Sequence, residues 1–376
     1  MCMTSAIISA YVRSPFTLAN KGELAKTRPD DLLAQVIKGL LAKAPFNTAD
    51  LEDVLAGCAF PEGEQGLNIA RLASFMAGLP MTTGGVTVNR FCGSSMDTIH
   101  TAVGNIACGS GEVFLCVGIE SMSRIPMGGF NPSPNPKLYD SMPGAYMSMG
   151  MTAEEINKTF KISRADQEKF ALASHQKAVK GDFSDEIIAI TTKAGSVTKD
   201  GCVRADANLE KMATLPPAFD EAGTVTAATS SPMTDGASAV LVTSEAYADK
   251  NKLPKIARIK SFAVSGIAPE IMGLGPVDAT RKALKRAGLS LGDIDIIELN
   301  EAFAVQSMAV IKELGLDITK VNLEGGAIAI GHPLGASGAR ITGKAAQLLH
   351  KSGKKYALAA MCIGGGQGIA TVLEKI

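Results

Sequence analysis

The sequence predicts an α/β protein built from two related halves. Two observations lead to this fold class. Strand-like and helix-like segments alternate along most of the chain, and an internal repeat recurs at a fixed offset. The composition agrees, because 46% of the 376 residues are apolar and only 20% are charged, which is enough to bury a large core.

The first half is predicted from five segments in chain order. A strand is expected over residues 5–11, where apolar and small residues follow one another. A helix follows over 29–42, because a proline and two acids at its start suit the first helical turn. Residues 86–90 alternate like a strand, 94–107 have helical spacing, and 112–117 read as a buried strand.

An internal repeat predicts that the second half copies the first. DLEDVLAGCAF at 50–60 and DIDIIELNEAF at 293–303 begin with the same Asp-aliphatic-acid pattern and end in Ala-Phe, 243 residues apart. At the same offset CGSSM (92–96) falls on GASGA (335–339). A constant register over this length indicates duplication of one structural unit.

Residues 119–235 have no counterpart in the second half and are expected to form an insertion. This segment opens with a Met-, Pro- and Gly-rich loop and continues into a polar helix with Ser163 as its N-cap. Long non-core segments usually carry function, so we interpret it as a binding excursion; the alternative is a surface decoration. The resulting division is 1–118 with 236–256, then 119–235, then 257–376.

Charge and composition exclude several classes of protein. Lys plus Arg and Asp plus Glu number 37 each and no basic block stands out, which argues against a nucleic-acid partner. No apolar run approaches the ~18–20 residues that span a bilayer. Neither end of the chain resembles a targeting signal, so we expect a cytoplasmic protein. The cysteines are scattered, with no CxxC pair, so reduced thiols and no metal site are expected; they stand at positions 2, 58, 92, 108, 116, 202 and 362.

Cys92 and His332 are the first candidates for chemistry. Cys92 stands in VTVNRFCGSSM, where a strand gives way to a helix, and a helix N-terminus there is expected to lower the pKa of the thiol. The alternative is an inert buried cysteine. His332 lies between a glycine and a proline in the loop that corresponds by register to the Cys92 loop. The other three histidines, His100, His175 and His350, fit structural roles in helices.

Cys362 and Asn300 are the second pair of candidates. Cys362 follows a buried strand and precedes three glycines (364–366), which suit an oxyanion-binding turn better than a dinucleotide loop because no GxGxxG spacing is present. Asn300 and Glu301 end a strand in ELNEAF and are either a loop start or part of the site. Two thiols, an imidazole and an amide suit acyl transfer through a covalent thioester.

Five blocks of the sequence resemble the signature blocks of the thiolase family. They are VNRFCGSSM, GTVTAATSSPMTDGASA, NEAFAVQ, GGAIAIGHPLGASGARIT and MCIGGGQGIA, in the family's order and spacing over essentially the whole chain. The resemblance is strongest to the bacterial degradative 3-ketoacyl-CoA thiolases (acetyl-CoA C-acyltransferases) of fatty-acid β-oxidation, which cleave a 3-ketoacyl-CoA with CoA. A biosynthetic acetoacetyl-CoA thiolase, which condenses two acetyl-CoA, is the alternative.

Two further alternatives are discriminated by single residues. Related condensing synthases carry a histidine around the position of Cys362. A non-catalytic acyl-CoA-binding or lipid-binding protein on the same fold would be expected to have lost Cys92 or His332, and both are present.

The resemblance implies a fold and a role for each matching residue. The fold is a thiolase-like αβαβα layered arrangement of two duplicated βαβαββ halves, with the inserted loop domain binding CoA and substrate. Cys92 matches the acyl-carrying nucleophile, His332 its base, Cys362 a second acid/base and Asn300 the holder of an oxyanion-hole water. The N–H groups of Cys92 and Gly364 match the other oxyanion hole. Residues matching the pantetheine and acyl channel are Ser231, Met149, Met272 and Phe303.

The resemblance also implies partners and leaves some points open. CoA is expected as a cosubstrate with no permanently bound cofactor, acyl-CoA as the other substrate, and a homodimer or dimer of dimers (a homotetramer) as the assembly. Association with a β-oxidation multienzyme subunit is a further expectation. The sequence departs from the family at Pro216, at Asp97 and in the missing Gly-rich run after Arg13. Acyl chain length, reaction direction and CoA phosphate contacts therefore stay open.

Overall fold

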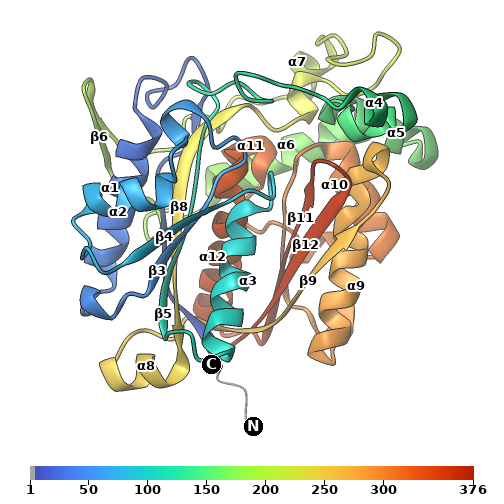
Figure 1. Ribbon diagram of the computed structural model, residues 1–376. Helices are drawn as coiled ribbons and strands as arrows, with labels where there is room; N and C mark the ends of the chain where they lie inside the picture. Colours follow the sequence, from blue (N-terminus) through green and yellow to red (C-terminus); the bar gives the residue numbers. More distant parts are fainter. Residues whose placement is uncertain (1–4) are drawn as a thin grey trace.

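Two sheets, joined into one ten-stranded sheet where β1 pairs with β9, alternate with three layers of helices in the computed structural model, which describes residues 5–376 (Figure 1). Cys2, one of the cysteines considered above, lies outside the described residues. The strands are β1 (Ala6–Arg13), β2 (Thr17–Leu18), β3 (Asp53–Gly57), β4 (Gly84–Val88), β5 (Val113–Ser121), β6 (Ile190–Thr192), β7 (Gly195–Val197), β8 (Thr234–Ser244), β9 (Ala257–Gly266), β10 (Ile296–Leu299), β11 (Tyr356–Ile363) and β12 (Gln367–Glu374). The helices are α1 (Pro29–Lys43), α2 (Ile69–Ala77), α3 (Ser94–Ala107), α4 (Pro136–Ser141), α5 (Met149–Phe160), α6 (Arg164–Lys180), α7 (Leu209–Ala213), α8 (Glu245–Asn251), α9 (Gly275–Ala287), α10 (Ala304–Leu314), α11 (Ala327–Ile330) and α12 (Leu334–Ser352).

The two halves have the same strand order. The first runs β4-β3-β5-β8-β1, with β3 parallel to both of its neighbours and the remaining pairs antiparallel. The second runs β10-β11-β12-β9 with the same directions, and its outermost strand is reduced to a single bridge between Ile297 and Val321. Among the described residues, two residue pairs join the two halves of the sheet: Ile7 with Arg258 and Ile8 with Ala257, between β1 and β9.

The predicted duplication is confirmed at the offset of 243 residues. Strand β3 begins at Asp53 and β10 at Ile296, while β5 begins at Val113 and β11 at Tyr356. When 243 is added to the residue numbers of α3, the resulting positions lie within α12. The register predicted from a few identities therefore describes the backbone itself.

Helices α3 and α12 form the central layer and pack against both sheets (Figure 1). They approach closely because α12 carries Gly338 at the crossing. A Cβ there would lie 2.4 Å from the backbone nitrogen of Met96 in α3, so only glycine fits. Helix α1 covers the outer face of the first sheet and α9 that of the second, each over its own apolar core.

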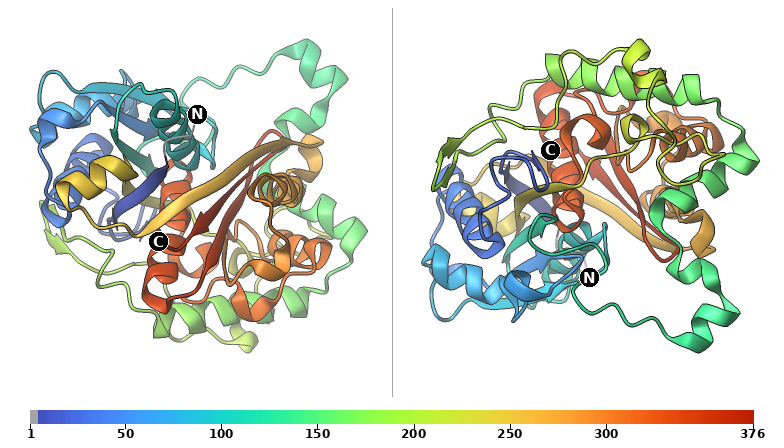
Figure 2. Two further views of the ribbon diagram at one scale, coloured as in Figure 1. Left: turned by 90° about the horizontal axis from the view of Figure 1, so that it is seen from below. Right: turned by 90° about the horizontal axis from the view of Figure 1, so that it is seen from above.

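The segment between β5 and β8 contains α4 to α7 and the β6-β7 hairpin, and the stretch around α4 projects from the layered body (Figure 2). Ser163 caps α6 as predicted, because its side chain accepts a hydrogen bond from the Asp166 N–H. A buried ion-pair chain anchors the insertion to both halves: Glu186 pairs with Arg13 of β1 at 2.6 Å and with Lys344 of α12 at 2.9 Å. The residue-level division into three segments stays a prediction.

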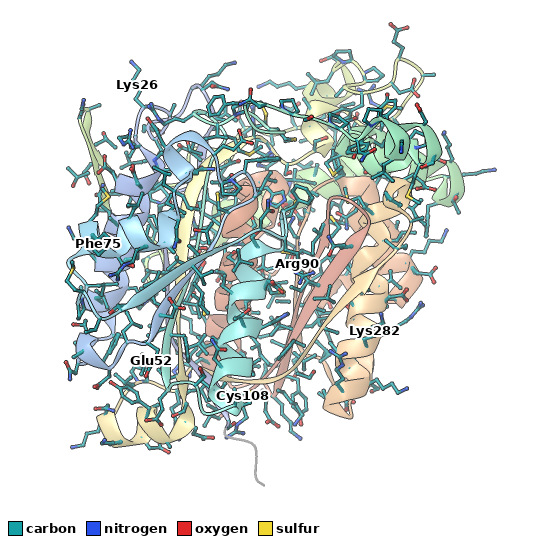
Figure 3. The ribbon with its side chains drawn as sticks, in the orientation of Figure 1. Lys26, Glu52, Phe75, Arg90, Cys108 and Lys282 are labelled. Atoms are coloured by element: carbon teal, nitrogen blue, oxygen red, sulfur yellow. The ribbon has the colours of Figure 1, made fainter. Side chains whose placement is uncertain are left out.

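The sequence predicts that Cys58, Cys108 and Cys116 are small core residues without a chemical role, and the structure divides them into two groups. Cys58 and Cys116 are buried, as expected. Cys108 is exposed, so the expectation that it fills the core is wrong. It caps the C-terminus of α3, at the opposite end of that helix from Arg90 (Figure 3), and the register of α3 turns this last position to solvent.

Candidate active site

Cys92 stands on a tight turn between β4 and α3. Phe91, the residue before it, has a φ of 43°, a left-handed conformation that is costly for a bulky side chain. The turn is held by Ser94, whose hydroxyl accepts from the Arg90 N–H and donates to the Phe91 carbonyl. A Cβ on Gly93 would lie 2.5 Å from the Ile363 side chain, so this turn is pressed against the end of β11 in the other half.

The environment of Cys92 favours the neutral thiol. Burial raises the pKa of Cys92 to about 11, and the negative charge of Glu120 acts in the same direction. The N–H groups of Gly364 and of Cys92 itself are directed at the sulfur and lower its pKa, but by less. The expectation that the helix N-terminus would lower the pKa is therefore wrong for the ligand-free chain, because desolvation outweighs these dipoles.

His332 is held in one tautomer by its neighbours. Its Nδ1 lies 2.6 Å from the Ser337 hydroxyl oxygen, and that hydroxyl donates its only hydrogen to the Pro333 carbonyl at 3.0 Å. We therefore assign the proton to Nδ1, which donates to Ser337, and this leaves the Nε2 lone pair as an acceptor. Burial lowers the pKa of His332 to about 4, so the ring is neutral at pH 7 and Nε2 can accept a proton.

Asn300 lies directly beside this lone pair. Its side-chain nitrogen Nδ2 is 3.3 Å from His332 Nε2, to which it donates. The backbone N–H of Asn300 continues the pairing of β10 with β11 by donating to the Ala360 carbonyl. Because β10 and β11 are parallel, Asn300 and Cys362 both stand at the carboxyl ends of neighbouring strands, where ligands bind in such sheets.

Cys362 and the glycine turn face Cys92 from the second half. Cys362 is 1% exposed, and burial followed by the proximity of Cys92 raises the pKa of its thiol well above the usual range. Gly365 and Gly366 have φ values of 77° and 80°, which side chains rarely tolerate, and this turn directs the Gly364 N–H to the Cys92 sulfur. The structure thus brings Cys92, Cys362 and Gly364 together, and it pairs His332 with Asn300, which lies at the end of the strand next to that of Cys362.

The four predicted channel residues lie around Cys362. Met272 and Phe303 share an apolar cluster with Cys362, and Met149 packs against it. The Met149 sulfur also lies next to Gly364, 3.4 Å from where a Cβ would stand. Ser231 is placed by its backbone N–H, which donates to the Ala302 carbonyl just before Phe303.

Profiles of two domains of one family match nearly the whole chain. The thiolase N-terminal domain matches residues 5–246 and the thiolase C-terminal domain matches residues 253–375. The chain belongs to the thiolase family. The family resemblance found in the sequence blocks is therefore confirmed.

Similar thiolases extend over the full length of the chain. The 3-ketoacyl-CoA thiolase of Bacillus subtilis is 43% identical, and that of Aliivibrio fischeri is 48% identical; each match covers 99% of this chain and 100% of the relative. The crystal structure of human mitochondrial 3-ketoacyl-CoA thiolase superposes with a TM-score of 0.91 at 38% identity, covering both chains fully. A structure of that human enzyme in complex with CoA has the same TM-score and identity, and the match covers 100% of this chain and 98% of that one. The predicted thiolase fold is confirmed.

A cavity of about 390 Å³ in the insertion of this thiolase was not anticipated from the sequence. It lies between α6, α7 and the loop before β8, and Arg204, Lys211 and Ser230 line it. His175 also lines it while accepting a hydrogen bond from the Arg204 N–H, and burial followed by the charge of Arg204 lowers the pKa of this histidine to about 4. The basic residues around 199–211 were visible in the sequence, but nothing there placed them beside Ser230.

Sequence reasoning also missed the residues that hold the thiolase site in shape. Ser337 could have been found, because a serine five residues after a histidine at a helix start can reach back to the ring. Thr234, whose hydroxyl accepts from the His332 N–H, comes from a distant strand and carries no local signal. Within residues 5–376 no group of three His, Cys, Asp or Glu could hold a metal ion, and no helix in that range is long and apolar enough to cross a membrane.

Proposed function

We propose that this chain catalyses the thiolytic cleavage of 3-ketoacyl-CoA by CoA, giving acetyl-CoA and an acyl-CoA shortened by two carbons. The observation that carries the proposal is the pair of thiols, Cys92 and Cys362, close enough for each to act on the other, together with a neutral histidine whose Nε2 is an acceptor. One thiol can then carry the acyl group while the other exchanges a proton with the leaving and entering groups. The names of the full-length relatives support the degradative direction.

In the first half-reaction Cys92 attacks the 3-keto carbon as His332 Nε2 takes the thiol proton. The oxyanion that forms is held by the N–H groups of Cys92 and Gly364, which already point to this sulfur. Each such donor is typically worth ~3–4 kcal/mol. The C2–C3 bond then breaks, leaving an acyl group on Cys92 and the enolate of acetyl-CoA, which Cys362 protonates at C2.

In the second half-reaction CoA replaces acetyl-CoA. The Cys362 thiolate formed in the first step takes the proton of the CoA thiol, and the CoA sulfur attacks the acyl group on Cys92. The C–S bond to Cys92 breaks, and His332 returns its proton to the sulfur. Asn300 stands beside His332 Nε2, at 3.3 Å, and supports the thioester oxygen of the enolate together with the histidine and a bound water.

Substrate binding is assigned to two regions. The acyl and pantetheine portions are placed along Met149, Met272, Phe303 and Ser231, around the buried Cys362. The nucleotide end of CoA is placed near the cavity of the insertion, where Arg204 supplies a cation for its phosphates. CoA thus acts as a cosubstrate that enters and leaves, with no permanently bound cofactor needed.

The test is CoA-dependent loss of 3-ketoacyl-CoA measured from acetoacetyl-CoA to 3-ketohexadecanoyl-CoA. Turnover of several chain lengths is expected, together with its loss in Cys92→Ala. Activity confined to acetoacetyl-CoA would instead support a biosynthetic acetoacetyl-CoA thiolase. Unchanged turnover in Cys92→Ala would contradict the assignment of the nucleophile.

The same proposal extends to assembly and location. Strand β4 is the outermost strand of its sheet, and Val86 on it and Met81 before it are 40% and 75% exposed. Edges of this kind are ready to pair with a second copy, which supports a homodimer or a dimer of dimers. We place the protein in the cytoplasm, where a β-oxidation multienzyme subunit is a further partner. Light scattering of the purified chain tests the assembly, and a monomer would contradict it.

A further inference from the structure

A fully buried carboxylate, Glu301, connects three segments behind the candidate site. It follows Asn300 directly and is 2% exposed. Its Oε2 accepts from the Ser174 hydroxyl of α6 at 2.6 Å and from the Ile328 N–H at 3.3 Å. Its Oε1 accepts from Asn322 Nδ2 at 2.7 Å. The residue after Asn300 thus touches the segment that leads to His332.

The backbone and side chains around Glu301 pack directly against its carboxyl group. A Cβ on Gly326 would lie 2.1 Å from the Glu301 carboxyl carbon, so glycine allows this approach. The Gly326 N–H donates to the Ser174 hydroxyl, which in turn donates to Glu301. Asn322 also pairs with both the N–H and the carbonyl of Leu299, at 2.9 and 2.8 Å, and so extends the edge of β10 as a strand would.

A second buried carboxylate, Glu120 of β5, holds the other end of the same segment. Its Oε2 accepts from the Gly335 N–H at 2.9 Å and from the Ala59 N–H at 2.8 Å. Its Oε1 accepts from Gln65 Nε2 at 2.8 Å. Gly335 opens α12 three residues after His332, so the histidine loop is tied on both sides.

We propose that Glu301 and Glu120 are positioning residues that clamp residues 326–335 at both ends and thereby hold His332 Nε2 against Asn300 and toward Cys92. Neither carboxylate forms a hydrogen bond with Cys92, Cys362 or the His332 ring, although the charge of Glu120 also acts on the Cys92 thiol, so the His332 signal is the readout specific to the clamp. Each gathers N–H and side-chain donors from several chain segments at one point, an arrangement that apolar packing cannot reproduce because donors would be left unpaired. The inference rests on the proposed roles of His332 and Cys92.

Glu301→Gln tests the first clamp, because glutamine has the shape of glutamate but replaces one accepting oxygen by an N–H₂ group. That group cannot accept the hydrogen bonds that the carboxylate accepts. We expect kcat for thiolysis to fall at least tenfold while KM for CoA stays within twofold. In the ¹⁵N-histidine spectrum of the substrate-free protein, the Nε2 signal of His332, assigned with His332→Asn, should move. A kcat within twofold of the parent, or a fallen kcat with an unmoved His332 signal, would overturn the clamp.

Ser174→Ala keeps the proposal testable where Glu301→Gln fails to fold. It removes one donor from Glu301 and leaves the carboxylate in place, so a three- to tenfold lower kcat is expected. Ser261→Ala is the matched control: this serine is also buried and donates to a carbonyl, that of Ala283, far from the histidine loop. Equal kcat values for the two serine variants would refute the role of Glu301.

Glu120→Gln tests the second clamp with the same two measurements, and a lowered kcat with a moved His332 signal is expected there too. An unmoved signal with parental kcat would confine the clamp to Glu301 and refute the role of Glu120. The spectrum is read without turnover. Unchanged activity in Cys92→Ala would refute the proposed function, whereas an unmoved His332 signal would refute the clamp. The two refutations are therefore distinguishable.

Discussion

Alkylation of Cys92 in the substrate-free protein should show no reactive thiolate at neutral pH. The pKa of the Cys92 thiol is about 11 and that of His332 about 4, so moving the proton from sulfur to Nε2 is uphill by about seven pKa units. At ~1.4 kcal/mol per unit this is ~9–10 kcal/mol. A turnover of about 10 s⁻¹ corresponds to a barrier of ~16 kcal/mol, so a neutral pair remains compatible with catalysis.

The assay is the rate of iodoacetamide alkylation against pH, read from the mass of the Cys92 peptide. With a pKa near 11 only about one Cys92 in a thousand is a thiolate at pH 8, so the rate should rise about tenfold per pH unit from 7 to 10 without a plateau. A cysteine peptide blocked at both ends, whose thiol has an ordinary pKa of about 8.5, is the control and should level off above about pH 9.5. A plateau for Cys92 below pH 9 would mean a preformed thiolate–imidazolium pair and would refute the reasoning.

Three further predictions concern the serine beside His332, the crossing of α3 and α12, and the cavity of the insertion. Ser337→Ala removes the acceptor of the His332 Nδ1–H and should lower kcat about tenfold at unchanged KM, in line with the ~10–100-fold effects of groups that orient a histidine. Gly338→Ala should cost about 2–3 kcal/mol in chemical denaturation, because its Cβ would collide with Met96. Arg204→Ala should raise KM for CoA several-fold and leave KM for pantetheine unchanged; equal changes for both thiols would place the phosphates elsewhere.

Local patterns were sufficient to predict the layers of the fold. The starts of β5 and α3 follow from hydrophobic spacing. The 243-residue repeat then predicts the equivalent strand and helix in the second half. Cys108 shows the limit of such patterns: an apolar residue at the last turn of a helix reads like core, and only the tertiary position of α3 decides that it faces solvent. The division of the chain into three segments likewise depends on tertiary contacts, which local patterns do not contain.

The site residues themselves could be named from the sequence, but their electrostatics could not. A cysteine at a helix start predicts a lowered pKa, because the dipole is visible in the sequence. The burial of Cys92 between Ile363, Leu334 and Met122 comes from three segments distant in the chain, and this desolvation reverses the sign. The contacts of Ser337 and Thr234 with His332 were not predicted from the sequence, because they depend on the tertiary position of the His332 loop.

The duplicated halves explain why one copy supplies the nucleophile Cys92 and the other supplies Asn300. Gly57 stands where the second copy has Asn300, and a Cβ on Gly57 would lie 2.3 Å from the Ser95 nitrogen, so the first half cannot carry an amide there. Gly335 stands where the first copy has Cys92, and a Cβ on it would lie 2.5 Å from the Ile119 carbonyl oxygen. Backbone of the first half forbids both side chains: the start of α3 excludes one at Gly57, and β5 together with the end of β3 excludes one at Gly335. The two halves can therefore complete one site only by each contributing what the other excludes.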